Sequence, residues 1–325
     1  MKETISVIIP VYNVKKYLPE ALESALKQDY QKLQVILIDD GSTDGSAEIC
    51  DEYARIDNRI IVIHQKNGGA ASAKNTGLRV ATGEFLAFLD SDDYLETGAY
   101  TFMVEQLRKY QADMVQCCFQ NVFRDKIETQ VGFSKIEEYT CVSYLELFTK
   151  DWTCGLLWDK LYRRKLFEDV FFEEGHKIDD EFFTYRGVMN ATKVVRVPKV
   201  IYNYRKRLSG VMLSKDFQEK IVLDKLEYLS IRRKIVTEKF PELKDVFDEH
   251  YLNMLLIVSK DSSASAEGMR KIKQLLKEYN SEARKISVNF GLKRRLIRLK
   301  YKSVEKLLKE KNVSEGRTDI SSYYD

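Results

Sequence analysis

Three aspartates, Asp90, Asp92 and Asp93, follow directly after the short apolar stretch 85–89. Such a stretch is typical of a buried strand in a parallel sheet, and open α/β sheets bind ligands beyond the carboxyl ends of their strands. Carboxylates this close repel one another unless a cation neutralises them, and hard oxygen ligands suit Mg²⁺ or Mn²⁺. The pattern therefore predicts a divalent metal that carries a phosphate. The alternative is a solvated acidic turn that caps the following helix.

A second apolar stretch, 33–38, also ends in acids, Asp39 and Asp40. Gly41 permits a tight turn after them, and the polar residues that follow can cap a helix that starts near position 46. A third strand-like stretch, 5–11, runs into the polar residue of position 13. Three strand ends of this kind should meet at one edge of a sheet, which predicts a ligand site there.

These segments resemble the ordered motifs of glycosyltransferase family 2, the nucleotide-sugar transferases with a GT-A fold. Four motifs spread over about the first hundred residues carry the resemblance, and their coincidence is far more specific than any one of them. They are Ser-Val-Ile-Ile-Pro-Val-Tyr-Asn at 6–13, Ile-Asp-Asp-Gly-Ser-Thr-Asp at 38–44, Asn-Gly-Gly-Ala-Ala-Ser-Ala-Lys-Asn-Thr-Gly at 67–77 and Leu-Asp-Ser-Asp-Asp at 89–93.

A looser resemblance, to bacterial capsule, teichoic-acid and adhesin-glycan transferases, continues to about residue 212. It rests on the segments 157–164, 177–183 and 202–209. The chain departs from the family pattern at two positions. Lys74 stands where arginine is usual, which keeps the charge but loses the planar fork, and Asp179 stands where glutamate is usual.

The resemblance implies a nucleotide-sugar donor, commonly UDP-linked, and Mn²⁺ or Mg²⁺ as a Lewis acid for the departing diphosphate. Asp92 is the expected direct metal ligand, with Asp93 beside it. Two arginines of 205–207 could clamp the diphosphate, although such a run is also typical of a solvated surface. The residues expected to bind the donor are Pro10, Tyr12, Asn13, Asp39, Asp40, Lys74, Asp90, Ser91, Arg205 and Arg207.

Asp180 matches the family's catalytic base, which removes a proton from the acceptor hydroxyl in an inverting displacement. The alternative is that Asp180 caps a helix beginning near Glu181. Three further residues are expected on the acceptor side: Trp158, Lys160 and Asp179. Trp158 is either a platform on which a sugar stacks or a core aromatic residue, and both interpretations stay open at this point.

Alternating periodicity predicts an α/β fold with a mostly parallel central sheet flanked by helices, followed by a helical C-terminal addition. We expect a catalytic domain over 1–214, with a nucleotide-sugar half (1–112) and an acceptor half (113–214), and a helical region over 215–325. The expected strands are 5–11, 34–38, 60–64, 84–89 and 114–119, and the expected helices are 17–28, 46–55, 70–81, 98–110, 220–239, 243–258 and 269–279.

Composition favours a cytoplasmic enzyme. With 325 residues, 44% of them hydrophobic, the chain can bury a sizeable core, and no run approaches the ~20 apolar residues of a membrane span. The five cysteines have no metal-ligand spacing, so we expect buried thiols. A net charge of only +3 gives no support for nucleic-acid binding.

The segment 284–311 has a different character, with eleven lysines and arginines against two acids and leucines at near-helical intervals. It is interpreted either as an amphipathic helix that packs on the catalytic domain or as a peripheral contact with the inner face of the plasma membrane. The apolar stripes of the region after 215 favour self-association into a homo-oligomer.

The sequence thus predicts an inverting, metal-dependent hexosyltransferase that moves a sugar from a nucleotide sugar to a hydroxyl of an acceptor. The expected acceptors are a bacterial surface glycan, a lipid-linked oligosaccharide or glycolipid, or a glycoprotein or glycopeptide, including O-glycans of an adhesin. A degenerate member that binds nucleotide as an assembly partner is the main alternative, and a nucleotidyltransferase is a weaker one, since no glycine-rich basic phosphate loop is present.

Overall fold

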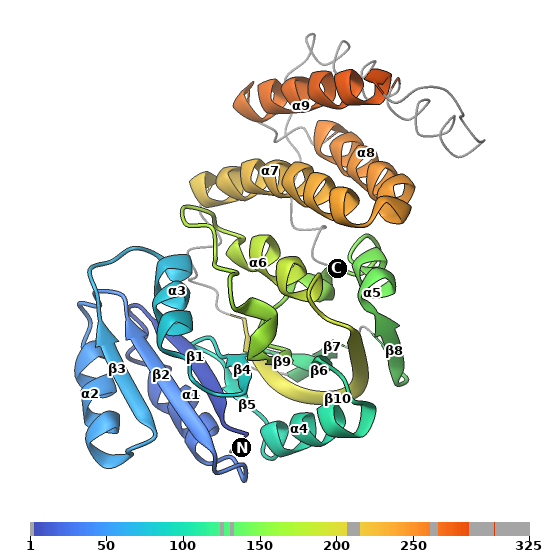
Figure 1. Ribbon diagram of the computed structural model, residues 1–325. Helices are drawn as coiled ribbons and strands as arrows, with labels where there is room; N and C mark the ends of the chain where they lie inside the picture. The colour runs from blue at the N-terminus through green and yellow to red at the C-terminus, as the bar shows by residue number, and fades with distance from the viewer. Residues whose placement is uncertain are drawn as a thin grey trace. The chain divides into compact units, whose positions relative to one another are not determined.

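The computed structural model describes residues 3–123, 127–130, 133–206, 215–260, 266–285 and 302. The chain forms two compact units, one of Met1–Gly175 with Asp179–Leu208 and the other of His176–Ile178 with Ser209–Asp325 (Figure 1). The boundary between the units lies near the expected one at 214 and 215, and the expected catalytic and helical domains stay predictions. A short segment, 176–178, belongs to the second unit although it precedes the end of the first.

A single mixed sheet organises the first unit, with the strand order β3-β2-β1-β4-β9-β6-β10-β5. Its parallel strands are β1 (Ile5–Val11), β2 (Leu33–Asp39), β3 (Ile60–His64), β4 (Phe85–Phe88), β6 (Met114–Val122) and β10 (Lys193–Arg205). Its antiparallel additions are β5 (Tyr94–Leu95), β7 (Ile127–Gln130), β8 (Glu137–Thr140) and β9 (Lys160–Arg163). The parallel pairing brings the carboxyl ends of β1, β2 and β4 to one edge.

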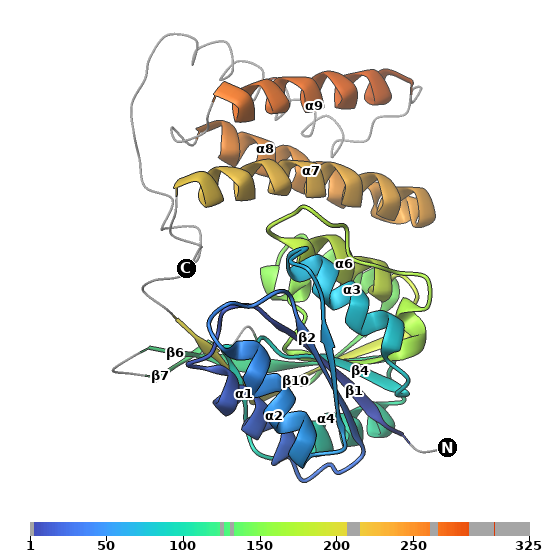
Figure 2. The same ribbon diagram turned by 90° about the vertical axis from the view of Figure 1, so that its left-hand side faces the viewer.

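Helices cover both faces of this sheet, with α1, α2 and α4 on one side and α3 and α6 on the other (Figure 2). Their bounds are α1 (Leu18–Leu26), α2 (Ser46–Ile56), α3 (Ala70–Val80), α4 (Ala99–Tyr110), α5 (Cys141–Leu147) and α6 (Asp179–Val188). The expected α/β architecture is confirmed. From the strand expected at 5–11 to the helix expected at 98–110, each expected strand and helix agrees with the structure to within two residues at each end.

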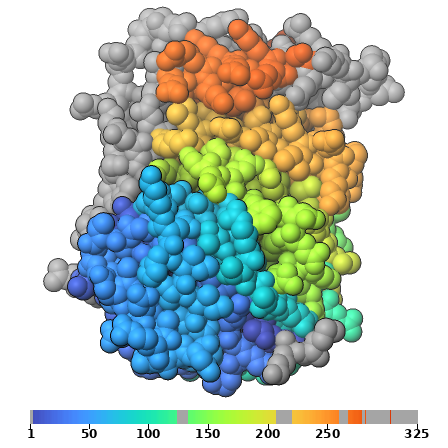
Figure 3. Space-filling model, turned by 60° about the vertical axis from the view of Figure 1, so that its left-hand side comes forward, coloured from blue at the N-terminus to red at the C-terminus, as the bar shows by residue number. Residues whose placement is uncertain are grey.

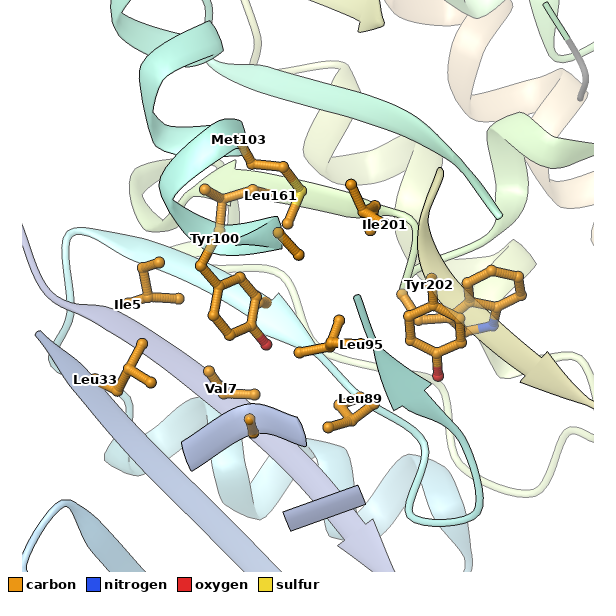
Figure 4. Close-up of a cluster of buried hydrophobic side chains, with 14 of the residues drawn as sticks. Ile5, Val7, Leu33, Leu89, Leu95, Tyr100, Met103, Leu161, Ile201 and Tyr202 are labelled. Atoms are coloured by element: carbon orange, nitrogen blue, oxygen red, sulfur yellow. The ribbon is translucent and has the colours of Figure 1, made fainter. Parts of the chain in front are cut away.

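Alternate residues of the strands supply the core beneath α1 and α4. Ile5 and Val7 of β1 point to this side, where Tyr100 and Met103 of α4 pack against them (Figure 4). All four are at most 1% exposed, and full burial of such a side chain contributes about 1.5–3 kcal/mol. The predicted thiols lie in such interiors: four cysteines are buried and Cys141 is half-buried.

An aromatic cluster fills the opposite face, between β4, β9 and α6. Phe88 contacts Tyr162, Phe172 and Phe183 edge to face. The Phe172 and Phe183 rings stack with centroids 3.8 Å apart. This cluster fixes α6 and the segment before it against the carboxyl half of β4.

The second unit is helical among its described residues and contains α7 (Lys215–Lys239), α8 (Lys244–Lys260) and α9 (Ala266–Lys285). The three predicted helices are found, each longer than the sequence pattern suggested. The basic residues after 285 fall outside the described residues, except for Lys302, and their predicted contacts stay predictions. Over the helices that the structure describes, none is both long enough and apolar enough to cross a bilayer.

Candidate active site

The turn after β4 is held in place by β10. The backbone N–H of Asp90 donates to the Tyr202 hydroxyl at 3.1 Å, and that hydroxyl donates to Asp93 Oδ2 at 3.0 Å. The backbone N–H of Arg205 donates to Asp93 Oδ1 at 2.7 Å. Asp93 is 1% exposed. Both of its carboxylate oxygens thus accept hydrogen bonds from the protein. Asp93, which was expected to bind metal, therefore stabilises the turn.

The Arg205 side chain lies over the same turn. Its Nε donates to the carbonyl of Asp92 at 2.8 Å, and its Nη2 pairs with Glu20 at 2.6 Å. The guanidinium also lies over the Tyr17 ring. Arg205 is therefore beside the acids as predicted, while Arg207 lies outside the described residues.

Negative charge in this turn exceeds the positive charge near it. Burial, together with the charges of Asp180 and Asp92, raises the pKa of Asp90 to about 7, although the charge of Lys74 opposes the shift. Burial also raises the pKa of Asp93, with the nearby charges of Asp92 and Asp90 adding to the effect. Hydrogen bonds from the described part of the chain do not reach the Asp90 carboxylate, so a cation would be favoured here.

These acids fit a metal ion only in part. Among the residues that the structure describes, no group of three or more His, Cys, Asp or Glu is placed to hold a metal. Mg²⁺ commonly binds through one or two carboxylates together with substrate phosphates and water. Asp92, which is partly exposed, and Asp90 fit that smaller role.

At the end of β2, Asp40 organises the loop that leads into α3. Its Oδ1 accepts hydrogen bonds from Gln65 Nε2 at 2.7 Å and from the Gly68 N–H at 2.8 Å. Its Oδ2 accepts from the Gly69 N–H at 2.8 Å. Gly69 has φ +88°, a conformation that favours glycine. Asp40, which was expected to bind the base of the donor, holds the two glycines that precede α3.

Asp39 is linked to the end of β3. Its Oδ2 lies 2.9 Å from His64 Nδ1, and its Oδ1 accepts from the Ser42 N–H at 3.0 Å. Burial opposes ionisation of Asp39, but the hydrogen bonds from His64 and Ser42 outweigh it and lower its pKa. The other ring nitrogen of His64 lies 3.1 Å from Asp51. His64 thus sits between two carboxylates.

The loop after β1 is tied to the loop after β2. Asn13 Oδ1 accepts from the Thr43 N–H at 2.8 Å, and the Asn13 N–H donates to Ser42 Oγ at 3.1 Å. Tyr12 is 50% exposed at this edge, so its ring is accessible to a ligand. Two more expected donor residues lie on the same strand ends: Pro10 within β1 and Ser91, which is buried, after β4.

Lys74, a residue of α3, forms an ion pair with Asp180, the expected catalytic base. Its Nζ lies 2.6 Å from Asp180 Oδ1 and 3.1 Å from Asp179 Oδ2. Burial disfavours its charge, but the carboxylates of Asp179, Asp180 and Asp90 outweigh that cost and raise the pKa of Lys74. Because α6 begins at Asp179, Asp180 lies inside the first turn rather than at the cap position. Acids there interact favourably with the helix dipole.

Two residues expected on the acceptor side lie in the interior. Trp158 is 6% exposed and stacks on Tyr202 at 4.3 Å, which matches its interpretation as a core aromatic residue. Lys160 is 1% exposed, and its ammonium donates to the carbonyl of Thr153 and to Asp159. The third, Asp179, pairs with Lys74 as described above.

Sequence reasoning missed two features of this region. Tyr202 holds the acidic turn, but its position inside a long strand gave no sign of that contact. Trp152 is 55% exposed on a short 3₁₀ helix, Trp152–Gly155, that contacts α6 through a hydrogen bond from Thr184 Oγ1 to the Gly155 carbonyl.

In the space-filling view, α6 and the first hundred residues form a continuous surface of the first unit (Figure 3).

The chain belongs to glycosyl transferase family 2, whose profile matches residues 6–171. It is 39% identical over 224 residues to the glycosyltransferase GlyG of Streptococcus pneumoniae serotype 4, a match that covers 65% of this chain and 74% of GlyG. It is 33% identical over 215 residues to the putative glycosyltransferase EpsH of Bacillus subtilis, covering 64% of this chain and 62% of EpsH. The protein is therefore a glycosyltransferase.

Solved structures support the fold. The structure of Staphylococcus aureus TarS, residues 1–349, in complex with UDP-GlcNAc has a TM-score of 0.59 and 23% sequence identity, and the match covers 94% of this chain and 92% of that one. TarS is a poly(ribitol-phosphate) β-N-acetylglucosaminyltransferase. At this level of identity the likeness establishes the shared GT-A architecture.

Proposed function

We propose that this protein transfers a sugar from a UDP-linked donor to a hydroxyl of a bacterial surface glycan, with inversion at the anomeric carbon. One observation carries the proposal. Asp180, the expected base, pairs with the buried Lys74 at 2.6 Å, and Asp90 of the acidic turn is near enough that its charge raises the pKa of the same lysine. A base for the acceptor and acids for a diphosphate are thus adjacent, as a single displacement requires.

In this reaction the acceptor oxygen attacks the anomeric carbon, and the bond from that carbon to the diphosphate breaks. Asp180 takes the proton of the attacking hydroxyl through Oδ2, the oxygen that does not contact Lys74. UDP leaves with the bonding electrons. Asp180 is 23% exposed at its side chain, which leaves it accessible to an acceptor.

Asp92 and Asp90 would hold a divalent ion together with the two phosphates, and that ion would supply a Lewis acid for the departing charge. Arg205 lies over the same turn and could contact a phosphate if its pairing with Glu20 opened. Tyr12 and the loop around Asn13 would contact the nucleotide base, while Asp39 and Asp40 fix the loops that shape its pocket.

The proposed donor and acceptor classes are inferred from related proteins. TarS has been solved with UDP-GlcNAc and with UDP, and its name specifies a poly(ribitol-phosphate) acceptor. A UDP-sugar donor and a glycan, glycolipid or glycopeptide acceptor follow for this chain by extension. A catalytically degenerate assembly partner is the alternative, but Asp40, Asp92 and Asp180 are all present in the sequence, which supports an active enzyme.

The test is hydrolysis of a panel of UDP-sugars by the protein with Mn²⁺ and without acceptor. We expect one UDP-sugar to release UDP well above the others, because pocket contacts select among sugars. A panel of the same sugars linked to GDP serves as the control. Release of UDP from none of the UDP-sugars, with UDP still bound, would favour the degenerate alternative.

A further inference from the structure

Two consecutive residues of α3 hold the part of the chain that contains the expected base. Asn75 exchanges two hydrogen bonds with the backbone of Phe172, from Asn75 Nδ2 to the carbonyl at 3.0 Å and from the N–H to Asn75 Oδ1 at 2.8 Å. Lys74 pairs with the first two residues of α6, as described above. Lys74 therefore holds the start of α6 against α3, and Asn75 holds the segment that precedes α6.

Lys74 is buried among groups that leave its ammonium few other partners. It is 5% exposed, and its Nζ lies over the Phe172 ring at 5.2 Å from the centroid. Asp179 is also buried, at 7% exposed. Burial raises the pKa of Asp179, and the charge of Lys74 opposes this. A buried carboxylate of this kind needs its cation, and the cation needs it in turn.

The two oxygens of Asp180 have different surroundings. Oδ1 is anchored by Lys74 at 2.6 Å, whereas Oδ2 receives no hydrogen bond from the described part of the chain. The backbone carbonyl of Asp180 accepts from Thr184 Oγ1, which fixes the first turn of α6 from the other side. One carboxylate oxygen is thus held in place and the other remains available to an acceptor hydroxyl.

We propose that Lys74 and Asp179 act as a matched pair that positions Asp180, and that Lys74 does not bind the donor phosphates. This inference rests on the proposed function, in which Asp180 is the base. The two positions at which the chain departs from the motifs it resembles, Lys74 and Asp179, face each other at 3.1 Å. A lysine with an aspartate spans a shorter gap than an arginine with a glutamate, so each departure suits the other.

The pair can be tested by exchange. Lys74→Arg and Asp179→Glu should each lower turnover of the best UDP-sugar by about tenfold, because a misplaced reacting group is costly. The double variant should recover to within about threefold of wild type, since the longer partners again fit each other. Lys74→Met should lower turnover by roughly 10²-fold while the Kd for UDP with Mn²⁺ changes less than about threefold.

Thermal unfolding of every variant separates a misfolded protein from a mispositioned base, and the exchange decides the matter even where Lys74→Met does not fold. If UDP affinity falls in step with turnover, Lys74 is a donor ligand and the inference is overturned. A double variant no better than the product of its single variants overturns it as well. A wild-type protein that turns over no UDP-sugar would instead contradict the proposed function, and this inference with it.

Discussion

Carboxylates at the edge of the sheet divide into two groups. Asp39, Asp40 and Asp93 accept hydrogen bonds at both oxygens and hold the loops together. Asp90, by contrast, receives no hydrogen bond to its carboxylate from the described residues, and neither does Oδ2 of Asp180. The first group builds the site, and the second group remains available to a cation and to an acceptor hydroxyl.

Replacement of Asp92 tests the metal part of this division. Asp92→Asn keeps the shape but removes the charge, so UDP-sugar turnover should fall by about 10²-fold or more. The Kd for UDP measured by calorimetry in Mn²⁺ should rise to its value in EDTA. Asp169→Asn, a change at an exposed acid of the same unit, serves as the control. Unchanged turnover of Asp92→Asn would show that Asp92 does not bind the metal.

His64 should make stability depend on pH. The hydrogen bond to Asp39, and then that to Asp51, raise the pKa of His64. A raised pKa means that the stabilisation is complete below the unfolded value of about 6.5 and is lost as pH rises through the folded value. His64 is 45% exposed, so the contribution should stay below about 1 kcal/mol.

Urea unfolding of wild type and His64→Asn at a series of pH values measures this contribution. The difference in the free energy of unfolding should be largest near pH 6 and shrink towards pH 9. Asp51→Asn should reduce the pH dependence without abolishing it. A difference that grows with pH would show that the imidazole is neutral in the folded protein.

The fit of α3 on β1 is set by the small residue Gly77. A Cβ at this position would lie 2.6 Å from Ile8 Cγ2, well inside normal contact. The close approach brings the helix that carries Lys74 against the centre of the sheet. Gly77 therefore controls how far α3 lies from the strand ends.

Gly77→Ala should destabilise the protein by about 1–3 kcal/mol, the usual cost of overpacking. Helix propensity alone predicts the opposite sign, a gain of roughly 0.5–1 kcal/mol for alanine over glycine. Denaturant unfolding of Gly77→Ala, Ile8→Ala and the double variant distinguishes the two effects. The clash requires the double variant to be more stable than the sum of the single changes predicts.

The long elements of the first unit up to β6 could be predicted, because apolar stretches of strand length alternate there with amphipathic stretches between Gly, Asp and Ser. The predicted ends of β2 and β4 therefore gave the correct positions of the acids that follow them. The strands and helices of this unit after β6, among them β9, β10 and α6, were not among the predicted elements. The partners of those acids could not be predicted, since Lys74 meets Asp180 and Asp93 meets Tyr202 across more than a hundred residues. Local sequence also does not show that Lys160 is buried with its own neighbour Asp159.

The second unit includes the short segment 176–178, which directly precedes α6 in the chain. Within it, buried Asp224 accepts the N–H of Lys177 and lies 3.3 Å from His176 Nδ1. The segment 176–178 runs directly into Asp179, where α6 begins. Loss of α7 would therefore remove a contact that holds 176–178, the residues before the helix that carries the proposed base.

A chain ending at residue 214 should keep UDP affinity, since all the expected donor residues precede that point, and lose most of its turnover. Asp224→Asn in the full chain should lower turnover in the same direction but less, because the fold of α7 remains. Calorimetry with UDP and the UDP-sugar assay measure both quantities. Full turnover in the shortened chain would show that 176–178 needs no support from residues 215–325.

Asp180 is proposed to take the proton of the attacking hydroxyl, and Asp180→Asn removes that ability while keeping the shape of the side chain. Asparagine fits the same space but cannot accept that proton, so kcat for the best UDP-sugar should fall by about 10²–10⁴-fold. The Kd for UDP with Mn²⁺ should stay close to the wild-type value. Turnover near the wild-type rate, or a loss of UDP affinity that accounts for the whole decrease, would contradict the assignment of Asp180 as the base.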